Sequence, residues 1–205
     1  VDAAVERLKE ALQLFESEQE PAGVRTIWFR LAMVLKDAGR RDEALAYAAR
    51  CRQVAEENQD EFLLCTSLTV MAQIEEDRDH PAEAERLYRA ALDSLQTDLS
   101  KKVAGAETQI ALGRLLIKRG ALAEAQLELN DALSRIEDIS LSIVLQAAAH
   151  EALAELREQQ GKLAATIKHL RKAQSLREQI AKRDARNKLA QVEARAAVAA
   201  AKKDA

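Results

Sequence analysis

Three histidines and two cysteines are the residues of this chain best suited to bind a metal ion or to act as a base or nucleophile. His80 lies in a predicted turn, whereas the other four lie on predicted helices: His150, His169, Cys51 and Cys65. The cysteines form no CxxC pair, and no two His, Cys or acidic residues have the spacing of a known ligand set. We therefore predict structural or solvent-facing roles for all five, with no metal site and no cofactor.

The sequence motifs of the common enzyme classes are missing. There is no GxGxxG, no phosphate-binding loop, no HExxH and no GxSxG, and the six glycines are too scattered to form a phosphate cradle. The acidic run Glu75 to Asp77 is typical of a solvated helix end, with a place in a ligand groove as the alternative. The sequence predicts no catalytic residue and a chain that is not an enzyme.

The elements that must position these residues repeat along the chain. Related amphipathic segments place Ala44, Ala84, Ala125 and Thr166 at intervals of 40, 41 and 41 residues. A fixed period of this length is the signature of a solenoid, in which each unit buries its apolar face against its neighbours. Glycines or an Asp-His-Pro turn separate two helices within each repeat, and such short loops predict antiparallel pairs.

The predicted array covers residues 1–175 and a helical coiled-coil linker covers 176–205. The array consists of a truncated repeat at 1–20 and full repeats at about 21–58, 60–97, 100–138 and 140–175. Trp28, Leu31, Ala32 and Leu35 have the i, i+3, i+4, i+7 spacing of a buried helix face. In the truncated repeat at 1–20, Ala4, Leu8 and Ala11 precede Ala44, Ala48 and Cys51 by 40 residues each. They are therefore predicted to form its buried face. Small residues predict close helix crossings at the pairs Ala32/Ala44, Ala72/Ala84 and Gly113/Ala125.

Composition agrees with long, solvated helices. Charged residues make up 32% of the chain, whereas it has only six Gly and two Pro. The fold class predicted is all-α, an α-α superhelix of about four and a half helical hairpins followed by a long C-terminal helix. No apolar run is long enough to span a bilayer, and the cysteines read as reduced packing residues of a cytoplasmic protein. The start at Val1, inside a helical pattern and without Met, indicates a fragment.

Charge is unevenly distributed along the chain. Residues 1–160 carry a net charge of -11, whereas residues 161–205 carry +8. One interpretation is that solvated helix faces simply differ in charge, and the other is that the basic end meets an acidic partner or nucleic acid. The basic segment has no aromatic residue for base stacking and no helix-turn-helix, which disfavours nucleic acid.

Two segments carry a resemblance to a known family. WFRLAMVLKDAGRRDEALAYAARC (Trp28 to Cys51) and QIALGRLLIKRGALAEAQLELNDA (Gln109 to Ala132) resemble the tetratricopeptide repeat, with its Leu-Ala or Leu-Gly pair, Gly turn and second-helix Ala residues. Glu75 and Arg157 depart from the pattern where it has an apolar residue. The resemblance implies a non-catalytic sensor or scaffold that binds a protein or peptide in a concave groove.

The resemblance also implies which residues line that groove, because first helices form the concave face of such arrays. The candidate groove residues are Thr26, Phe29, Met33, Lys36, Thr66, Thr69, Gln73, Glu76, Glu107, Ile110, Arg114, Lys118, Glu151, Glu155 and Glu158. Among them, Arg114 and Lys118 form an i, i+4 pair of cations that could bind a peptide carboxylate. The alternative is that they pair with neighbouring glutamates.

The C-terminal segment predicts one continuous helix from Lys162. A candidate dimer seam follows 3-4-3 spacing along it, at Leu189, Val192, Ala196 and Ala199. Repeats followed by such a helix are similar to bacterial signalling proteins in which a sensor region joins a diguanylate cyclase or histidine kinase output domain. This similarity implies a parallel homodimer that regulates an output domain beyond residue 205. The alternatives are the effector-sensing part of a nucleic-acid-binding regulator and a purely structural assembly adaptor.

Overall fold

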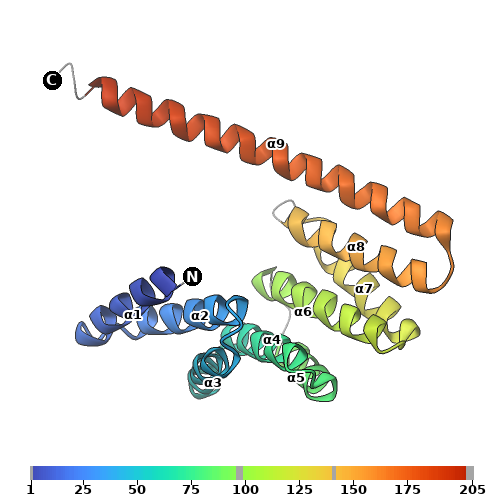
Figure 1. Cartoon of the computed structure of the whole chain (residues 1–205), viewed down its shortest axis with the longest axis horizontal. Coiled ribbons are helices and arrows are strands. Elements are labelled where there is room, and N and C mark those ends of the chain that lie inside the picture. Colours follow the sequence, from blue (N-terminus) through green and yellow to red (C-terminus); the bar gives the residue numbers. More distant parts are fainter. Residues whose placement is uncertain (1, 96–98, 140–141, 202–205) are drawn as a thin grey trace. The chain divides into compact units, whose positions relative to one another are not determined.

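The chain is all-α, as the sequence predicts. The computed structural model describes residues 2–95, 99–139 and 142–201, with the backbone alone at 99–101 and 195–201 (Figure 1). These ranges hold nine α-helices and no strand. The helices are α1 (Asp2–Ser17), α2 (Pro21–Asp37), α3 (Arg41–Asn58), α4 (Glu61–Asp77), α5 (Pro81–Asp93), α6 (Leu99–Lys118), α7 (Leu122–Ile136), α8 (Ile143–Gln159) and α9 (Leu163–Ala201).

Tight turns separate the helices of each pair. Gly39, Gly120 and Gly161 adopt the left-handed region with φ of 74°, 77° and 72°, where an L side chain would be strained. In the second repeat, Asp79 takes this role with φ 62°, and Pro81 then starts α5 at a position where its missing N–H costs nothing. The predicted turns are therefore confirmed.

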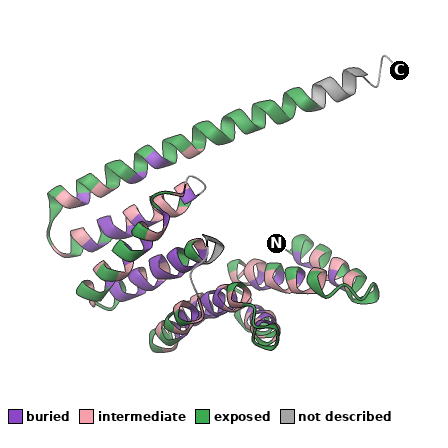
Figure 2. Cartoon of the chain, turned by 180° about the vertical axis from the view of Figure 1, so that it is seen from behind, coloured by how far each residue is buried: buried purple, intermediate pink, exposed green. Residues whose placement is uncertain are grey.

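Contacts divide the chain into two compact units, residues 1–135 and 136–205. In the first unit each helix packs on the next, from α1 to α6, and α4 also packs on α2 and on α6. The first helices of successive repeats are thus neighbours. Leu31, Ala32 and Leu35 are fully buried, which confirms the predicted face of α2. Figure 2 shows burial concentrated along α4 and α6 in this unit.

Small residues occupy buried positions of the helices, as the sequence predicts. Ala32, Ala44, Ala72 and Ala84 are completely buried. A Cβ at Gly113 would lie 2.7 Å from both Cγ and Cδ2 of Leu129. The side chain nearest to Gly113 is therefore that of Leu129, one turn along α7 from Ala125, and Ala125 is itself fully buried.

The predicted buried face of α1 is wrong by about one residue. The structure buries Val5 and Leu12, whereas Ala4 is exposed and Leu8 and Ala11 are only partly covered. Val5 and Leu12 precede the buried residues Ala44 and Cys51 of α3 by 39 residues and not 40. Larger side chains remove more apolar surface from water, so the helix turns Val5 and Leu12 towards α2.

The second unit is a hairpin of α8 and α9. Leu153 and Leu156 of α8 are buried, as are Ala173 and Leu176 of α9. The continuous helix predicted from Lys162 is confirmed, because α9 runs unbroken for 39 residues and extends well past α8 (Figure 1). All of residues 181–194 are exposed. No described helix is both long and apolar enough to cross a membrane.

Candidate functional site

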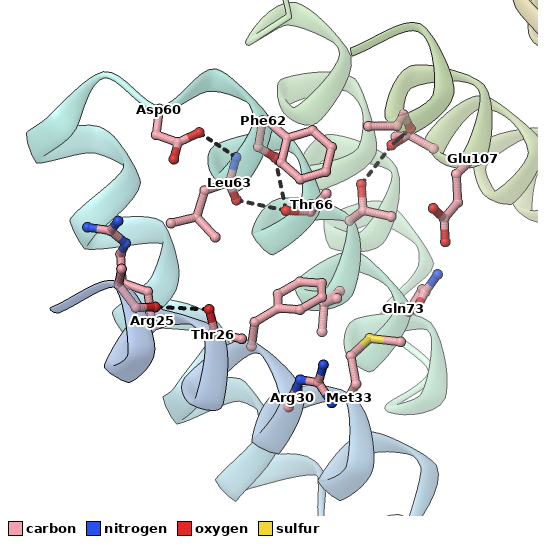
Figure 3. Close-up of a pocket in the computed structure, with 16 residues that line it drawn as sticks. Arg25, Thr26, Arg30, Met33, Asp60, Phe62, Leu63, Thr66, Gln73 and Glu107 are labelled. Atoms are coloured by element: carbon pink, nitrogen blue, oxygen red, sulfur yellow. Dashed lines mark hydrogen bonds between the residues drawn. The ribbon is translucent and has the colours of Figure 1, made fainter. Parts of the chain in front are cut away.

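A concave groove of about 700 Å³ lies on the first unit, where α2, α4 and α6 run side by side (Figure 3). We call it the α2–α4–α6 groove. Its walls are Ala22, Arg25, Thr26, Phe29, Arg30 and Met33 of α2, Asp60, Phe62, Leu63, Thr66, Thr69, Val70 and Gln73 at and along α4, and Ala104, Glu107 and Thr108 of α6. Residues three and four apart share one helix face, so each helix contributes one stripe of side chains.

The groove brings together seven of the residues predicted from the sequence. They are Thr26, Phe29, Met33, Thr66, Thr69, Gln73 and Glu107. Lys36 lies beside it and donates to Gln73 Oε1 at 2.7 Å. Ile110 is only 5% exposed and belongs to the core between the helices.

Sequence reasoning missed the most exposed large apolar residue of the groove. Phe62 keeps 46% of its surface accessible. It precedes Thr66 by one helical turn, so extending the predicted stripe of α4 by four residues would have found it. The same extension from Phe29 and Thr26 on α2 would have found Arg25 and Arg30.

The hydroxyl groups of the groove threonines already donate hydrogen bonds to backbone carbonyls of their own helices. Thr26 donates to the carbonyl of Ala22 at 2.9 Å, and Thr66 donates to the carbonyl of Phe62 at 2.9 Å. Thr69 donates to the carbonyl of Cys65 at 2.8 Å and lies 2.8 Å from the Thr108 hydroxyl. A hydroxyl that donates to its own helix keeps only acceptor capacity towards a ligand.

Glu107 is the acidic residue that α6 contributes to the groove, in addition to Asp60 beside α4. Its surface is accessible, yet neighbouring protein atoms displace much of the water around the carboxyl, and this desolvation raises the pKa of Glu107 while the positive charge of Lys36 opposes the rise. Among the described residues, Glu107 has no salt-bridge partner. A carboxylate in this state gains most from a cation supplied by a ligand.

The two cations predicted to bind a peptide carboxylate have different surroundings. Lys118 lies 3.1 Å from Oε2 of Glu76, and Oε1 of the same carboxylate accepts a hydrogen bond from Tyr88 at 2.6 Å. This is the pairing with a neighbouring glutamate that the sequence left as the alternative. Arg114 is half-buried on α6. Neither cation lines the α2–α4–α6 groove.

The remaining candidate residues lie in the second unit. Glu151 of α8 forms an ion pair with Arg177 of α9, while Glu155 and Glu158 are exposed. The groove is formed by the first unit alone, so these three glutamates are not part of it. In the candidate dimer seam, Leu189 and Val192 are 60% and 63% exposed. The side chains of Ala196 and Ala199 lie outside the described residues.

The histidines and cysteines show no arrangement that points to catalysis. His150 and His169 face each other across α8 and α9 with their Nδ1 atoms 3.1 Å apart. Within the described ranges, no three His, Cys, Asp or Glu residues are close enough to hold a metal ion. Burial raises the pKa of Cys51 to about 11 and also raises the pKa of Cys65, so both thiols stay protonated and unreactive at neutral pH.

Comparisons with known proteins bear on both family and fold. The tetratricopeptide repeat family matches residues 23–97. The crystal structure of BtubC (BKLC) from P. vanneervenii is similar with a TM-score of 0.66 and 20% identity, over 87% of this chain and 81% of that one. The apo form of RapI is similar with a TM-score of 0.57 and 15% identity, over 87% of this chain and 59% of RapI. No curated protein matches the sequence.

Proposed function

We propose that this chain, whose residues 23–97 match the tetratricopeptide repeat family, is a non-catalytic scaffold that binds a segment of a protein partner. The α2–α4–α6 groove is the proposed binding site. The observation that carries the proposal is an accessible apolar surface on a rigid support, since Phe62 remains 46% exposed in a groove of about 700 Å³. Exposed apolar surface of this kind typically marks an interaction site.

A peptide segment fits this groove for physical reasons. Three packed helices hold its walls, so little ordering is needed when a ligand binds. Phe29, Phe62 and Met33 offer apolar surface whose burial contributes roughly 25 cal/mol per Å². The volume falls in the range of about 300–1,000 Å³ that holds a ligand or a few peptide side chains.

The same proposal includes a role for α9. Residues 181–194 of this helix are exposed throughout, and Leu189 and Val192 stand on its surface. We propose that the helix pairs with a second copy as a parallel homodimer and transmits binding to an output domain beyond residue 205, of the diguanylate cyclase type. The two cysteines, neither of which is in a disulfide, support a reducing, cytoplasmic setting.

Selection from a random peptide display library on the whole chain tests the binding function. We expect enriched peptides with apolar side chains, and we expect Phe62→Ala to weaken their binding by about tenfold, which corresponds to about 1.4 kcal/mol. Leu14→Ala is the matched control, because Leu14 is 56% exposed on α1 and does not line the groove. If nothing is enriched, or if both variants weaken binding equally, the groove is not the binding site.

A further inference from the structure

Two charged groups of the α2–α4–α6 groove, Arg25 and Glu107, are separated by its apolar surface. Arg25 and Glu107 lie at opposite ends in Figure 3, with Phe62 and Met33 between them. Arg25 comes from α2 and Glu107 from α6, the first helices of two repeats that flank α4. The groove therefore presents a donor at one end and an acceptor at the other.

The end of the groove at Glu107 is suited to bind a cation. Desolvation of the carboxyl raises the pKa of Glu107. A cationic group of a ligand that replaced the lost water would stabilise the ionised carboxylate and form an ion pair with it. Lys36, the cation whose charge acts on Glu107, is already held by Gln73 at 2.7 Å and Asp37 at 3.6 Å. The hydroxyl oxygens of Thr66 and Thr69 add acceptors along the adjacent wall, because their protons are committed to α4.

The end of the groove at Arg25 is suited to bind an anion. Arg25 lines the groove at this end and forms no salt bridge with a described residue, whereas Arg30 lies beside Met33 (Figure 3). Asp60 is the nearby acid, but its Oδ1 accepts from the backbone N–H of Leu63 at 2.9 Å and serves as the N-cap of α4. Guanidinium groups offer five donors in a planar fork that suits a carboxylate.

We infer that the groove selects a peptide segment in which an apolar side chain stands between a basic residue, bound at Glu107, and an acidic residue, bound at Arg25. The inference rests on the proposed function and adds its ligand class. The apolar side chain lies against Phe62, Phe29 and Met33. A segment with two acidic flanks places a carboxylate against Glu107, and one with two basic flanks places a cation against Arg25, so like charges disfavour both.

Charge-swap selection tests this ligand class. The random peptide library is selected in parallel on the wild-type chain, on Glu107→Lys and on Arg25→Glu, all at one ionic strength because salt screens exposed charges. Wild-type selection should enrich segments with one basic and one acidic flank. Selection on Glu107→Lys should exchange the basic flank for an acidic one, and selection on Arg25→Glu should exchange the acidic flank for a basic one.

A single-peptide measurement completes the test. The peptide most enriched on the wild-type chain is labelled and titrated against wild type and Glu107→Gln, which removes the charge at nearly constant size. We expect its Kd to rise at least about fivefold, and we expect no such change for a version of the peptide whose basic residue is replaced by Gln. Far-ultraviolet circular dichroism confirms that each variant remains helical.

The outcomes separate this inference from the proposed function. If apolar peptides are enriched and Phe62→Ala weakens them, but their flanks show no charge preference, the scaffold function holds and the ligand class is wrong. An unchanged Kd on Glu107→Gln has the same meaning. If no peptide is enriched on any version, the binding function itself is wrong, and if peptides are enriched but Phe62→Ala has no effect, the groove is not the binding site.

Discussion

The Nδ1 atom of His80 lies 2.7 Å from Oε2 of Glu75, so a buried carboxylate near the end of α4 spans the turn that leads into α5. The other oxygen, Oε1, accepts from Arg78 at 3.0 Å. In the fourth repeat, Arg157 stands at the corresponding position and donates to Gln160 at 2.7 Å. Both residues depart from the apolar pattern of the repeat because each one ties down the turn that follows it.

Replacing this carboxylate should therefore cost stability. Glu75→Ala leaves His80 without its acceptor and leaves Arg78 with Asp42 alone as an acidic partner, and we expect a loss of about 1–3 kcal/mol in the free energy of unfolding. Arg86→Ala is the control, because its ion pair with Glu83 is exposed and such pairs contribute no more than about 1 kcal/mol. Urea denaturation measures both. Equal losses would show that the Glu75 contacts do not stabilise the turn.

The contact between Gly113 and Leu129 predicts non-additive energetics. Gly113→Ala places a Cβ 2.7 Å from Leu129, and overpacking of this kind costs about 1–3 kcal/mol, against a gain in helix propensity of about 1 kcal/mol. In a Leu129→Ala background the new methyl group has room, so only the gain remains. Leu129→Ala alone should cost about 2–5 kcal/mol, since Leu129 is fully buried.

A double-mutant cycle on these two residues, followed by urea denaturation, measures the coupling directly. We expect Gly113→Ala to be neutral or destabilising in the wild-type chain and stabilising beside Leu129→Ala. If the two effects simply add, the α6–α7 packing described here is wrong.

Protonation of the histidine pair should loosen the second unit in mild acid. The pKa of His150 is lowered to about 4 by burial and by the positive charges of His169 and Lys172. The pKa of His169 is lowered by burial and by Arg157 and Lys168. In the unfolded chain both pKa values are near 6.5, so the unfolded state binds more protons between about pH 6.5 and 4. The stability that the neutral pair provides is complete above pH 6.5 and is lost as the pH falls through this window.

Thermal unfolding between pH 7.5 and about pH 5, above the range where most carboxylates titrate, tests this dependence. The melting temperature of the wild-type chain should fall as the pH is lowered. A His150→Gln, His169→Gln double variant should show a flatter profile. Identical profiles would mean that the pair does not contribute to the pH dependence.

The helices and turns could be predicted from the sequence because the signals for them are local. Gly39, Gly120 and Gly161 mark positions with positive φ, and apolar residues at helical spacing identify the buried faces. The register of α1 could not be predicted in the same way. Ala4 and Val5 both begin stripes at helical spacing, and the choice depends on which side chains fill the space beside α2.

The groove was predictable only in part for a related reason. Helical spacing places Thr66 and Gln73 on one face of α4, but it does not show which charges are already paired across repeats. Lys118 reaches Glu76, 42 residues away in sequence, because a long flexible side chain can cross from α6 to α4. Such pairing depends on the separation of two helices, which the sequence of either helix does not contain.

The exposed end of α9 predicts association between copies. Sedimentation equilibrium of the wild-type chain should show a dimer at micromolar concentration. Leu189→Glu with Val192→Glu should abolish it, because charges would then face each other across the seam. Lys188→Glu, a change of charge on a neighbouring exposed position, is the control. A wild-type chain that is monomeric at these concentrations would contradict the homodimer.

Site-specific photo-crosslinking from the groove tests the central claim most directly. A photoreactive phenylalanine analogue replaces Phe62 in one version of the chain and Leu14 in another, since both positions are about half exposed and only Phe62 lines the groove. Each version is irradiated with the labelled peptide most enriched from the library. The binding site described here predicts crosslinked peptide from position 62, competed by unlabelled peptide, and none above background from position 14. Equal crosslinking from both positions, or crosslinking from position 14 alone, would show that the α2–α4–α6 groove does not bind the peptide.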